Sequence, residues 1–414
     1  MTDAATLGDP NRYLTSMVAA IVGADNELIT EVTINEVSFT ESLLTPGLQT
    51  TVYLQDTIHT EWFRNLDNYR GKFLEIKATR NILSEYKEFT RHDFFTRQQI
   101  YRLSNRENDN YQIESFRLDA CDPTLLTDAK TWVTASWQCV SPSKVVDDIL
   151  TNCIGATSVD IENSLEPRTY FAENLHPFQV ITQQGEVALT EKDYDPSFIH
   201  FMTYQDSNHE DNPTHHFRSL NQLANQEPVM RLVYNGKGIT SLNYVNPYDI
   251  MSYSFPCDFD LLSDILNGYD ENGKFIKGLI AINPTNQTAA LIGNQGDCGI
   301  TPSVAITTKG TETEQNTCPS SLEQYLLYRK ARMGLLEQDK IALRLTIPFN
   351  PNLNVGRVID VNFQNHKAVN NGVYDYLYGS GLYLITNLTH NIKRGGLGVT
   401  IMDCVAQTVA EGIV

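Results

Sequence analysis

Two stretches of this sequence, far apart in the chain, carry the same succession of β-strand patterns. The first runs from Gly71-Lys-Phe-Leu-Glu-Ile through Ile100-Tyr-Arg-Leu to Leu118-Asp-Ala-Cys121, and the second runs from Gly356-Arg-Val-Ile-Asp-Val through Leu382-Tyr-Leu-Ile to Met402-Asp-Cys404. The glycine-to-tyrosine spacing is 30 residues in the first and 27 in the second, and the tyrosine-to-cysteine spacing is 20 and 21. Repetition at this length predicts a duplicated β domain, although two unrelated hairpins could also look alike.

Strand patterns fill the first stretch and extend it toward the N-terminus. Apolar residues alternate at period two up to Ile34 and resume in the opposite phase at Val37, which predicts a β-bulge near Glu36. Roughly five strands at this density predict a small antiparallel barrel or sandwich over residues 28–125. Residues 11–22, just before it, are expected to form a short helix.

The middle of the chain has a mixed α and β texture. Ser141-Pro142 is typical of a helix start and Gly155 of a helix end, so a helix is expected over 141–153. The later helices are expected at 177–189, 259–266 and 320–336, and the later strands at 198–204, 215–220, 229–234, 239–244, 343–347, 359–363, 383–390 and 397–403.

The chain is therefore predicted to be mostly β with α+β insertions, in the form of two similar small antiparallel β-barrel domains plus an inserted α+β domain. The expected boundaries are an N-terminal extension at 1–27, the first barrel at 28–125, the α+β domain at 126–228, a discontinuous second barrel at 229–250 and 330–414, and an insertion at 251–329 with a polar loop at 294–320.

Charge and apolar patterning exclude several classes of protein. The 31 Lys and Arg against 50 Asp and Glu give a net charge of −19, which argues against a protein that grips nucleic-acid phosphates or anionic membranes. No apolar run is long enough to span a membrane, and the N-terminus lacks the basic start of a signal peptide. The 7 Cys include no CxxC pair, so free thiols in a reducing cytosol are expected.

Motifs that carry chemistry are missing from the sequence. It contains no GxSxG, HExxH, Walker loop or GxGxxG, so no catalytic residue and no cofactor-binding residue is predicted. His215 and His216, beside His209, Glu210 and Asp211, have the ligand types of a metal site, but a solvated hairpin tip is the simpler interpretation. The prediction is therefore no enzyme, no cofactor and no metal.

The order of several short motifs resembles the baseplate central hub proteins of contractile-tailed, T-even-like bacteriophages. These motifs are Glu41-Ser-Leu-Leu-Thr-Pro46-Gly, Tyr53-Leu-Gln-Asp56, Phe198-Ile-His-Phe, His216-Phe-Arg-Ser-Leu220, Arg329-Lys-Ala-Arg-Met and Leu345-Thr-Ile-Pro-Phe-Asn350, in addition to the two repeats. Phe349 departs from the pattern, since related hubs often have Gly after the Pro. The resemblance extends over about residues 28–405.

This resemblance implies a structural virion protein. Such hubs are homotrimers whose two tube-type barrels per chain make a six-fold-like ring. The ring adapts a hexameric tail tube to a trimeric cell-puncturing spike and lines the channel through which DNA is ejected. The implied partners are other copies of the chain, the spike protein, tail-tube or tube-initiator proteins and other baseplate proteins. DNA would pass in transit without being bound. The implied location is the virion tail baseplate, with synthesis in the host cytoplasm.

The polar faces of the barrel strands are the candidate bore or subunit contacts: Glu31, Thr33, Asn35, Glu75, Lys77, Asp360 and Asn362. A neutral or negative bore would let DNA pass without holding its phosphates. Three alternatives stay open at this point: a tail-associated peptidoglycan hydrolase, a tail-tube initiator or secretion-spike hub, and a carbohydrate-binding tail-fibre module.

Overall fold

The structure is a computed structural model. It describes residues 15–56, 69–80, 93–110, 113–165, 167–192, 195–206, 211–234, 249–256, 262, 265, 279–283, 288–292, 303–306, 343–370, 373–376, 379–394 and 398–409, to which all structural statements below refer. The expected strand at 239–244, the expected helix at 320–336 and most of the loop at 294–320 lie outside these residues.

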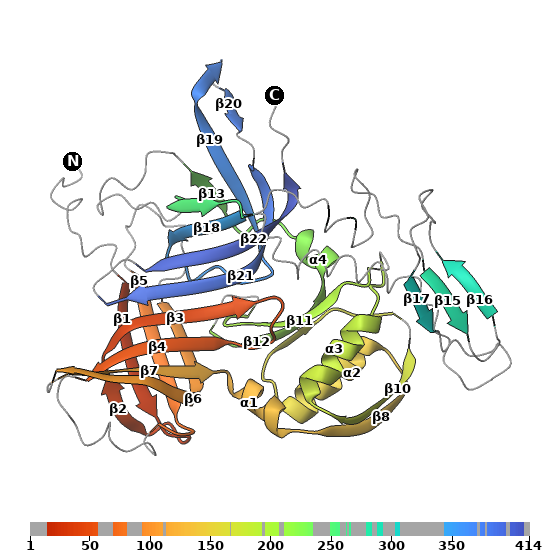
Figure 1. Cartoon of the computed structure of the whole chain (residues 1–414), viewed down its shortest axis with the longest axis horizontal. Coiled ribbons are helices and arrows are strands. Elements are labelled where there is room, and N and C mark those ends of the chain that lie inside the picture. The colour runs from red at the N-terminus through yellow and green to blue at the C-terminus, as the bar shows by residue number, and fades with distance from the viewer. Residues whose placement is uncertain are drawn as a thin grey trace.

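The first part of the chain is a strongly curled antiparallel sheet, drawn in red to orange in Figure 1. Its strands are β1 (Thr15–Val22), β2 (Leu28–Val32), β3 (Ile34–Ser42), β4 (Gln49–Asp56), β5 (Phe73–Arg80), β6 (Asp93–Asn110) and β7 (Ile113–Cys121). Alternate residues of these strands face inward and form one apolar core, which includes Phe39, Val52, Ile76, Phe94 and Leu118.

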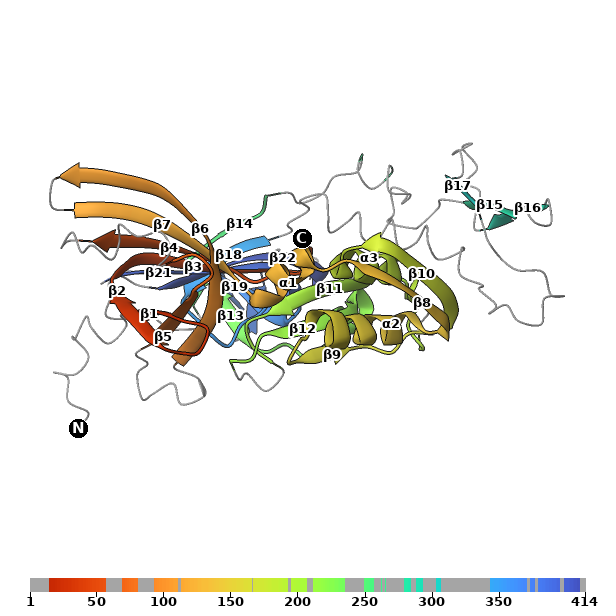
Figure 2. The same ribbon diagram turned by 90° about the horizontal axis from the view of Figure 1, so that it is seen from below.

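The middle part is the expected α+β domain, in which α2 and α3 lie against β8 and β10 (Figure 2). Its elements are α1 (Pro123–Lys130), β8 (Val133–Val140), α2 (Pro142–Asp148), a π-helical segment (Ile149–Ile154), β9 (Val159–Ile161), β10 (Arg168–Leu175), α3 (Pro177–Val187), β11 (Phe198–Thr203), β12 (Thr214–Ser219) and α4 (Leu220–Ala224). The helix start at Ser141-Pro142 is confirmed, and so is the helix end at Gly155, whose φ is 73°.

The last part is again mostly antiparallel and is drawn in green to blue. Its strands are β13 (Arg231–Tyr234), β14 (Ser252–Ser254), β18 (Leu343–Pro348), β19 (Val358–Asn370), β20 (Val373–Tyr376), β21 (Gly381–Lys393) and β22 (Val399–Val409). A separate small sheet consists of β15 (Leu279–Asn283), β16 (Thr288–Ile292) and β17 (Ser303–Ile306). The second barrel has its own apolar core, which includes Leu345, Val361, Tyr383 and Met402.

Strand pairing joins the two barrels into one sheet of 14 described strands. Its path is β14-β18-β22-β21-β3-β4-β7-β6-β5-β1-β2, with β13, β19 and β20 attached beside it. The predicted fold class is therefore confirmed: two similar small antiparallel barrels with an α+β domain between them. The predicted bulge near Glu36 is confirmed as a register shift between Ile34 and Glu36 against β4.

The helix expected over residues 11–22 is wrong, because Thr15–Val22 is strand β1. It pairs with β5 along its whole length, and Ala19 and Ile21 enter the core while Val18 stays 64% exposed. This short segment is apolar in both phases, so its sequence does not distinguish a strand from a helix. The pairing partner decides between them.

The expectation of free thiols is confirmed in part. Cys121, Cys153 and Cys404 are free, with Cys121 and Cys404 buried. Cys139 is disulfide-bonded, so the prediction is wrong for this residue. The absence of a CxxC pair excludes a disulfide only at that spacing.

Three parts of the fold meet at a single buried carboxylate. Glu41 of β3 is 2% exposed. Its Oε1 accepts the Tyr204 N–H at 2.8 Å, just after β11, and its Oε2 accepts the Val355 N–H at 2.9 Å, just before β19. Burial raises the pKa of Glu41 to about 7, although the two backbone bonds oppose that change. One side chain thus connects both barrels to the middle domain.

Replacement of Glu41 should therefore alter how stability depends on pH. The folded state keeps the Glu41 proton up to about pH 7, whereas an unfolded chain loses it near 4.5. Stability from this group is present below pH 4.5 and is lost as the pH rises through 7, by about 3 kcal/mol in total. Between pH 4.5 and 7.5, we expect the free energy of unfolding of the native protein to fall by about 3 kcal/mol more than that of Glu41→Gln. Urea unfolding measures it, and parallel pH profiles would contradict the assignment.

Candidate assembly surface

One antiparallel strand pair, which we call the seam, joins the two barrels. Residues 36–42 of β3 pair with residues 387–393 of β21. The Asn391 amide donates to Glu36 Oε1 at 2.8 Å, and Lys393 Nζ lies 3.6 Å from Glu36 Oε2. The seam is therefore a main-chain ladder with polar side-chain contacts beside it.

Each barrel repeats the same turn in front of β5 or β19. Gly71 and Gly356 have φ of 73° and 77°, which glycine adopts without steric cost. The carbonyl of the next residue then accepts a hydrogen bond from the following long strand: Ile100 N–H to Lys72 O at 2.8 Å, and Ile385 N–H to Arg357 O at 3.0 Å. These bonds make β6 the counterpart of β21.

A β-bulge follows at the same position in both barrels. Tyr101 is the extra residue in the first barrel and Thr386 is the extra residue in the second, one position after the bonded isoleucine. The facing pairs around them are Ile100 with Ala120 and Arg102 with Asp119, and then Ile385 with Cys404 and Asn387 with Asp403. Asp119 and Asp403 therefore occupy equivalent positions.

The predicted repeat has the same strand order in both barrels but a shifted alignment. The orders are β5-β6-β7-β4-β3 and β19-β21-β22-β18-β14. Cys404 matches Ala120, one residue from the predicted Cys121, whereas Tyr383 matches Gln98, three residues from the predicted Tyr101. The two tyrosines do different things: Tyr101 lies in the bulge and is 48% exposed, while Tyr383 is 1% exposed.

The repeat leaves two strand edges without a partner among the described strands. β5 covers β6 only over 93–99, so residues 102–108 of β6 have β7 on one side alone. This edge is the counterpart of the part of β21 that pairs in the seam. β14 lies at the end of the strand path and is the counterpart of β3, the other strand of the seam.

The side of this sheet that faces away from the two cores carries paired charges. Arg344 Nε donates to Asp403 Oδ1 at 2.6 Å on β18 and β22, and Arg117 Nε donates to Asp119 Oδ1 at 2.7 Å on β7. Together with the Lys393 and Glu36 pair of the seam, these contacts place both signs of charge close together on one polar face. We call this surface, over β18, β22, β21, β3, β4 and β7, the polar wall.

The predicted bore and contact residues fall on separate strands. Thr33 is exposed, and Asn35, at the bulge of β3, donates its amide to Gln55 Oε1 at 3.1 Å. The side chain of Glu31 lies outside the described residues. The structure therefore brings only Asn35 of this group next to the polar wall.

The remaining predicted residues lie on β5 and β19. Lys77 is exposed, and Glu75 lies 3.7 Å from Arg97 Nη1. Asp360 lies 3.3 Å from Arg231 Nε. Asn362 is only 7% exposed. These four residues do not gather at one place.

The polar wall consists mostly of residues that the sequence analysis did not select. Asp119 and Asp403 were inside the repeated motifs, where each follows an apolar residue by one position. That signal could have identified them as outward-facing equivalents. The cross-strand partners Arg117 and Arg344 could not be assigned before the register was known.

The prediction that the histidine pair lies on a solvated hairpin tip is wrong. His215 is 1% exposed and lies on β12, where its Nδ1 is 3.1 Å from His200 Nε2 on β11. His216 bonds through Nδ1 to Asp160 Oδ2 at 2.9 Å. Burial lowers the pKa of His215 to about 3, and burial also lowers the pKa of His216, although its bond to Asp160 opposes that change. His209 and Glu210 lie outside the described residues.

Two further properties concern the described residues as a group. None of their helices has the length and apolarity required to cross a membrane. Nor do they bring three or more His, Cys, Asp or Glu side chains together in an arrangement suited to a metal ion.

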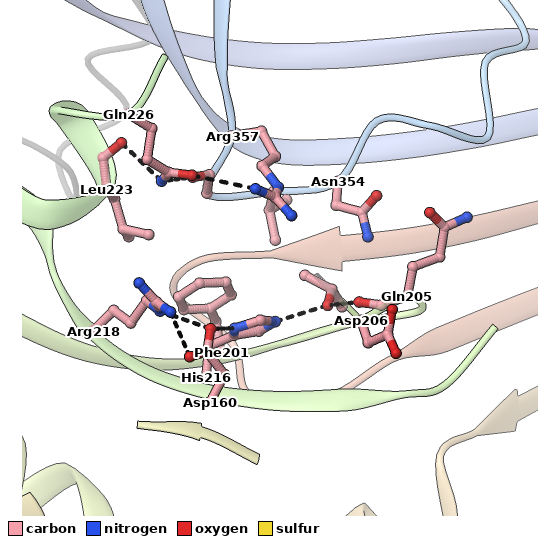
Figure 3. A pocket seen from close by; sticks show the side chains of 13 residues that line it. Asp160, Phe201, Gln205, Asp206, His216, Arg218, Leu223, Gln226, Asn354 and Arg357 are labelled. Atoms are coloured by element: carbon pink, nitrogen blue, oxygen red, sulfur yellow. Dashed lines mark hydrogen bonds and ion pairs between the residues drawn. The ribbon is translucent and has the colours of Figure 1, made fainter. Parts of the chain in front are cut away.

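A small pocket lies where the middle domain meets the second barrel (Figure 3). Its volume is about 80 Å³. Asp160, His216 and Arg218 line one side, and Gln226 and Arg357 lie across from them. Burial raises the pKa of Asp160, but bonds from His216 and Arg218 outweigh it and hold the pKa below its usual range.

Two solved structures with a similar fold are tail proteins. The tail protein from Neisseria meningitidis MC58 aligns with a TM-score of 0.55 at 8% identity, covering 95% of this chain and 97% of that one. The 43 kDa tail protein of prophage MuSo2 from Shewanella oneidensis aligns with a TM-score of 0.52 at 8% identity, covering 94% and 97%. No family model and no curated protein matches the sequence. The fold expected from the hub resemblance is therefore confirmed as a tail-protein fold.

The buried histidines should make the protein sensitive to acid. His390 of β21 is 1% exposed, and burial lowers its pKa to about 3. An unfolded chain takes up this proton near pH 6.5, so stability is present above 6.5 and is lost as the pH falls toward 3. As the pH falls, we expect the free energy of unfolding of His390→Asn to decrease by about 1.4 kcal/mol per pH unit less than that of the native protein. Unfolding measured between pH 7.5 and 4.5 tests this, and an unchanged slope would contradict it.

Proposed function

We propose that this chain is a structural, non-enzymatic component of a phage tail: the trimeric hub of a baseplate, which joins a hexameric tail tube to a trimeric spike. The observation that carries the proposal is the seam together with its two counterpart edges, beside which no other described strand lies. The chain contains one such interface, the seam, and also the two strand edges that could form a second one. These edges could therefore pair between copies of the chain.

The repeat specifies how that pairing would occur. Within the chain, β3 of the first barrel pairs with residues 387–393 of β21. The equivalent contact would place β14 of one copy against residues 102–108 of β6 in the next copy. Both contacts would be antiparallel ladders between sheet edges. An unpaired edge readily accepts such a strand.

This contact is heterologous, since one edge of a copy meets a different edge of its neighbour. Such contacts form a closed ring when the rotation between copies divides a full turn. Three copies would supply six barrels, which is the number that fits a six-fold tube. The copy number rests on the hub resemblance alone, whereas the described edges, one of each kind in each chain, support a head-to-tail ring.

The polar wall is the proposed lining of the channel. In a closed ring, one face of a continuous sheet must line the inside, and the apolar faces are already buried in the two cores. The lining would carry Glu36 with Lys393 and Arg344 with Asp403, so its charges would largely cancel. DNA phosphates would find few unpaired cations to bind there.

The finer assignments also belong to this proposal. The partners would be the spike protein, tube or tube-initiator proteins and other baseplate proteins, in the virion tail. The proposed domain limits keep the barrels at 28–125 and at 229–250 with 330–414, and strand β1 supports an earlier start for the first barrel. Asn35 is the predicted bore residue that this arrangement favours most.

Breaking the β14 edge should prevent ring formation without unfolding the chain. Ser254 is an exposed residue of this short edge strand. Proline removes one N–H and is tolerated at sheet edges. We expect the native chain of 46.7 kDa to form a particle of about 140 kDa, as trimerisation requires, and Ser254→Pro to stay monomeric. Light scattering measures both masses.

The matched control is Ser254→Ala, which keeps the N–H and should assemble normally. Circular dichroism shows whether each variant is folded. A folded Ser254→Pro protein that still forms trimers would remove β14 from the interface, and a native dimer would contradict the ring itself.

Reversing a charge on the polar wall should slow DNA delivery. Glu36→Lys puts a second cation beside Lys393, and the loss of this half-exposed pair should cost folding only about 1 kcal/mol or less. We expect normal numbers of assembled particles but slower DNA ejection, while Glu36→Gln stays close to native. Equal ejection rates in all three would place Glu36 outside the channel.

A further inference from the structure

The pocket between the middle domain and the second barrel contains an arginine that lacks a counter-ion among the described residues. Arg357, just before β19, is half-buried, and its Nη1 has one long hydrogen bond of 3.4 Å to Gln226 Oε1. Burial and the neighbouring Arg218 lower the pKa of Arg357, and the charge of Asp160 offsets this only in part. A guanidinium carries five N–H donors, so most of its donors have no partner in the described part of the chain.

Asp160, whose charge acts on Arg357, already has direct partners of its own. Asp160 already accepts Nε of Arg218 at 2.7 Å, a second bond from Nη2 of Arg218, and Nδ1 of His216 at 2.9 Å. Its negative charge is therefore shared between two other groups. Figure 3 shows this cluster across the pocket from Arg357.

Gln205, a second residue that lines the pocket, has a hydrogen-bond acceptor without a donor. Gln205 is 2% exposed, and its Nε2 donates to Pro351 O at 2.6 Å. Its Oε1 is buried and has no hydrogen-bond partner among the described residues. Leaving a buried acceptor without a donor is unfavourable. Arg357 thus lacks an acceptor, and Gln205 Oε1 lacks a donor but is covered in this conformation, so its amide must turn toward the pocket to meet one.

We propose that this pocket binds a carboxylate whose neighbouring group carries an N–H or O–H donor. The carboxylate would bond to Arg357, because guanidinium and carboxylate geometries match, and the donor would bond to Gln205 Oε1 once the Gln205 amide turns toward the pocket. A volume of about 80 Å³ admits a group of this size and excludes a nucleotide. Asp206 lines the pocket as well, so the anion belongs at the Arg357 side.

Two sources carry this chemistry: the C-terminal residue of another polypeptide, with its carboxylate and N–H, and a free hydroxy acid. N-acetylglycine represents the first and glycolate the second. Calorimetry with the full-length chain at constant ionic strength should show binding of at least one of them. N-acetylglycinamide, which lacks the charge, should not bind. The tighter of the two carboxylates identifies the source.

Arg357→Gln should weaken that binding at least about tenfold, in keeping with the loss of a charge-assisted bond. Arg231→Gln is the matched control, because Arg231 is a surface arginine paired with Asp360, and it should bind like the native protein. No binding of either carboxylate to the native chain, or equal binding by Arg357→Gln, would overturn the inference. The ligand series uses the native protein, so a folding defect in one variant leaves the test decisive.

This site does not depend on the proposed ring. A trimer that binds no carboxylate would overturn the pocket assignment and leave the hub proposal in place. A chain that stays monomeric but binds N-acetylglycine would overturn the hub proposal and leave the pocket assignment in place.

Discussion

The arrangement of the whole molecule depends on the carboxylate of Glu41. A buried carboxylate is costly unless hydrogen bonds satisfy it, and here both bonds come from main-chain N–H groups of other parts of the fold. Tyr204 and Val355 must therefore keep their places relative to β3. The same strand forms the seam with β21. The angle between the barrels and the position of the middle domain are thus fixed together, and a ring made from such units requires that angle to be constant.

The seam also explains how a duplicated barrel can assemble further. A repeat within one chain creates an interface between its two copies, and under the proposed function that interface would have an equivalent between β14 of one chain and β6 of the next. The turns at Gly71 and Gly356 and the bulges at Tyr101 and Thr386 keep the two copies alike. A bulge increases local twist, and therefore two bulges at equivalent positions curve both sheets in the same way. Equal curvature lets the proposed contact between chains have the geometry of the seam.

The sequence predicted the parts of this fold that depend on local periodicity. Period-two alternation identified most barrel strands, the phase change identified the bulge at Glu36, and Ser141-Pro142 with Gly155 delimited the helical segment. It could not predict features that depend on a partner. Strand β1 is recognisable only through its pairing with β5, and the burial of His215 only through its contact with His200. Glu41 and Arg357 look like surface residues in the sequence, because nothing near them in the chain shows that three segments close over them.

The net charge of the whole chain does not predict the local charge of the polar wall. A value of −19 describes the whole chain, whereas the polar wall pairs Glu36, Asp119 and Asp403 with basic partners. The excess of acidic residues must therefore lie mainly elsewhere. A channel lined by such pairs would avoid DNA because its cations are already occupied, with no need for a strongly negative wall. Paired charges also remain close to neutral over a wide range of salt, since screening weakens both signs equally. Pairing across strands requires a fixed register, so the same ladder bonds that close the sheet would also set the charge that passing DNA meets.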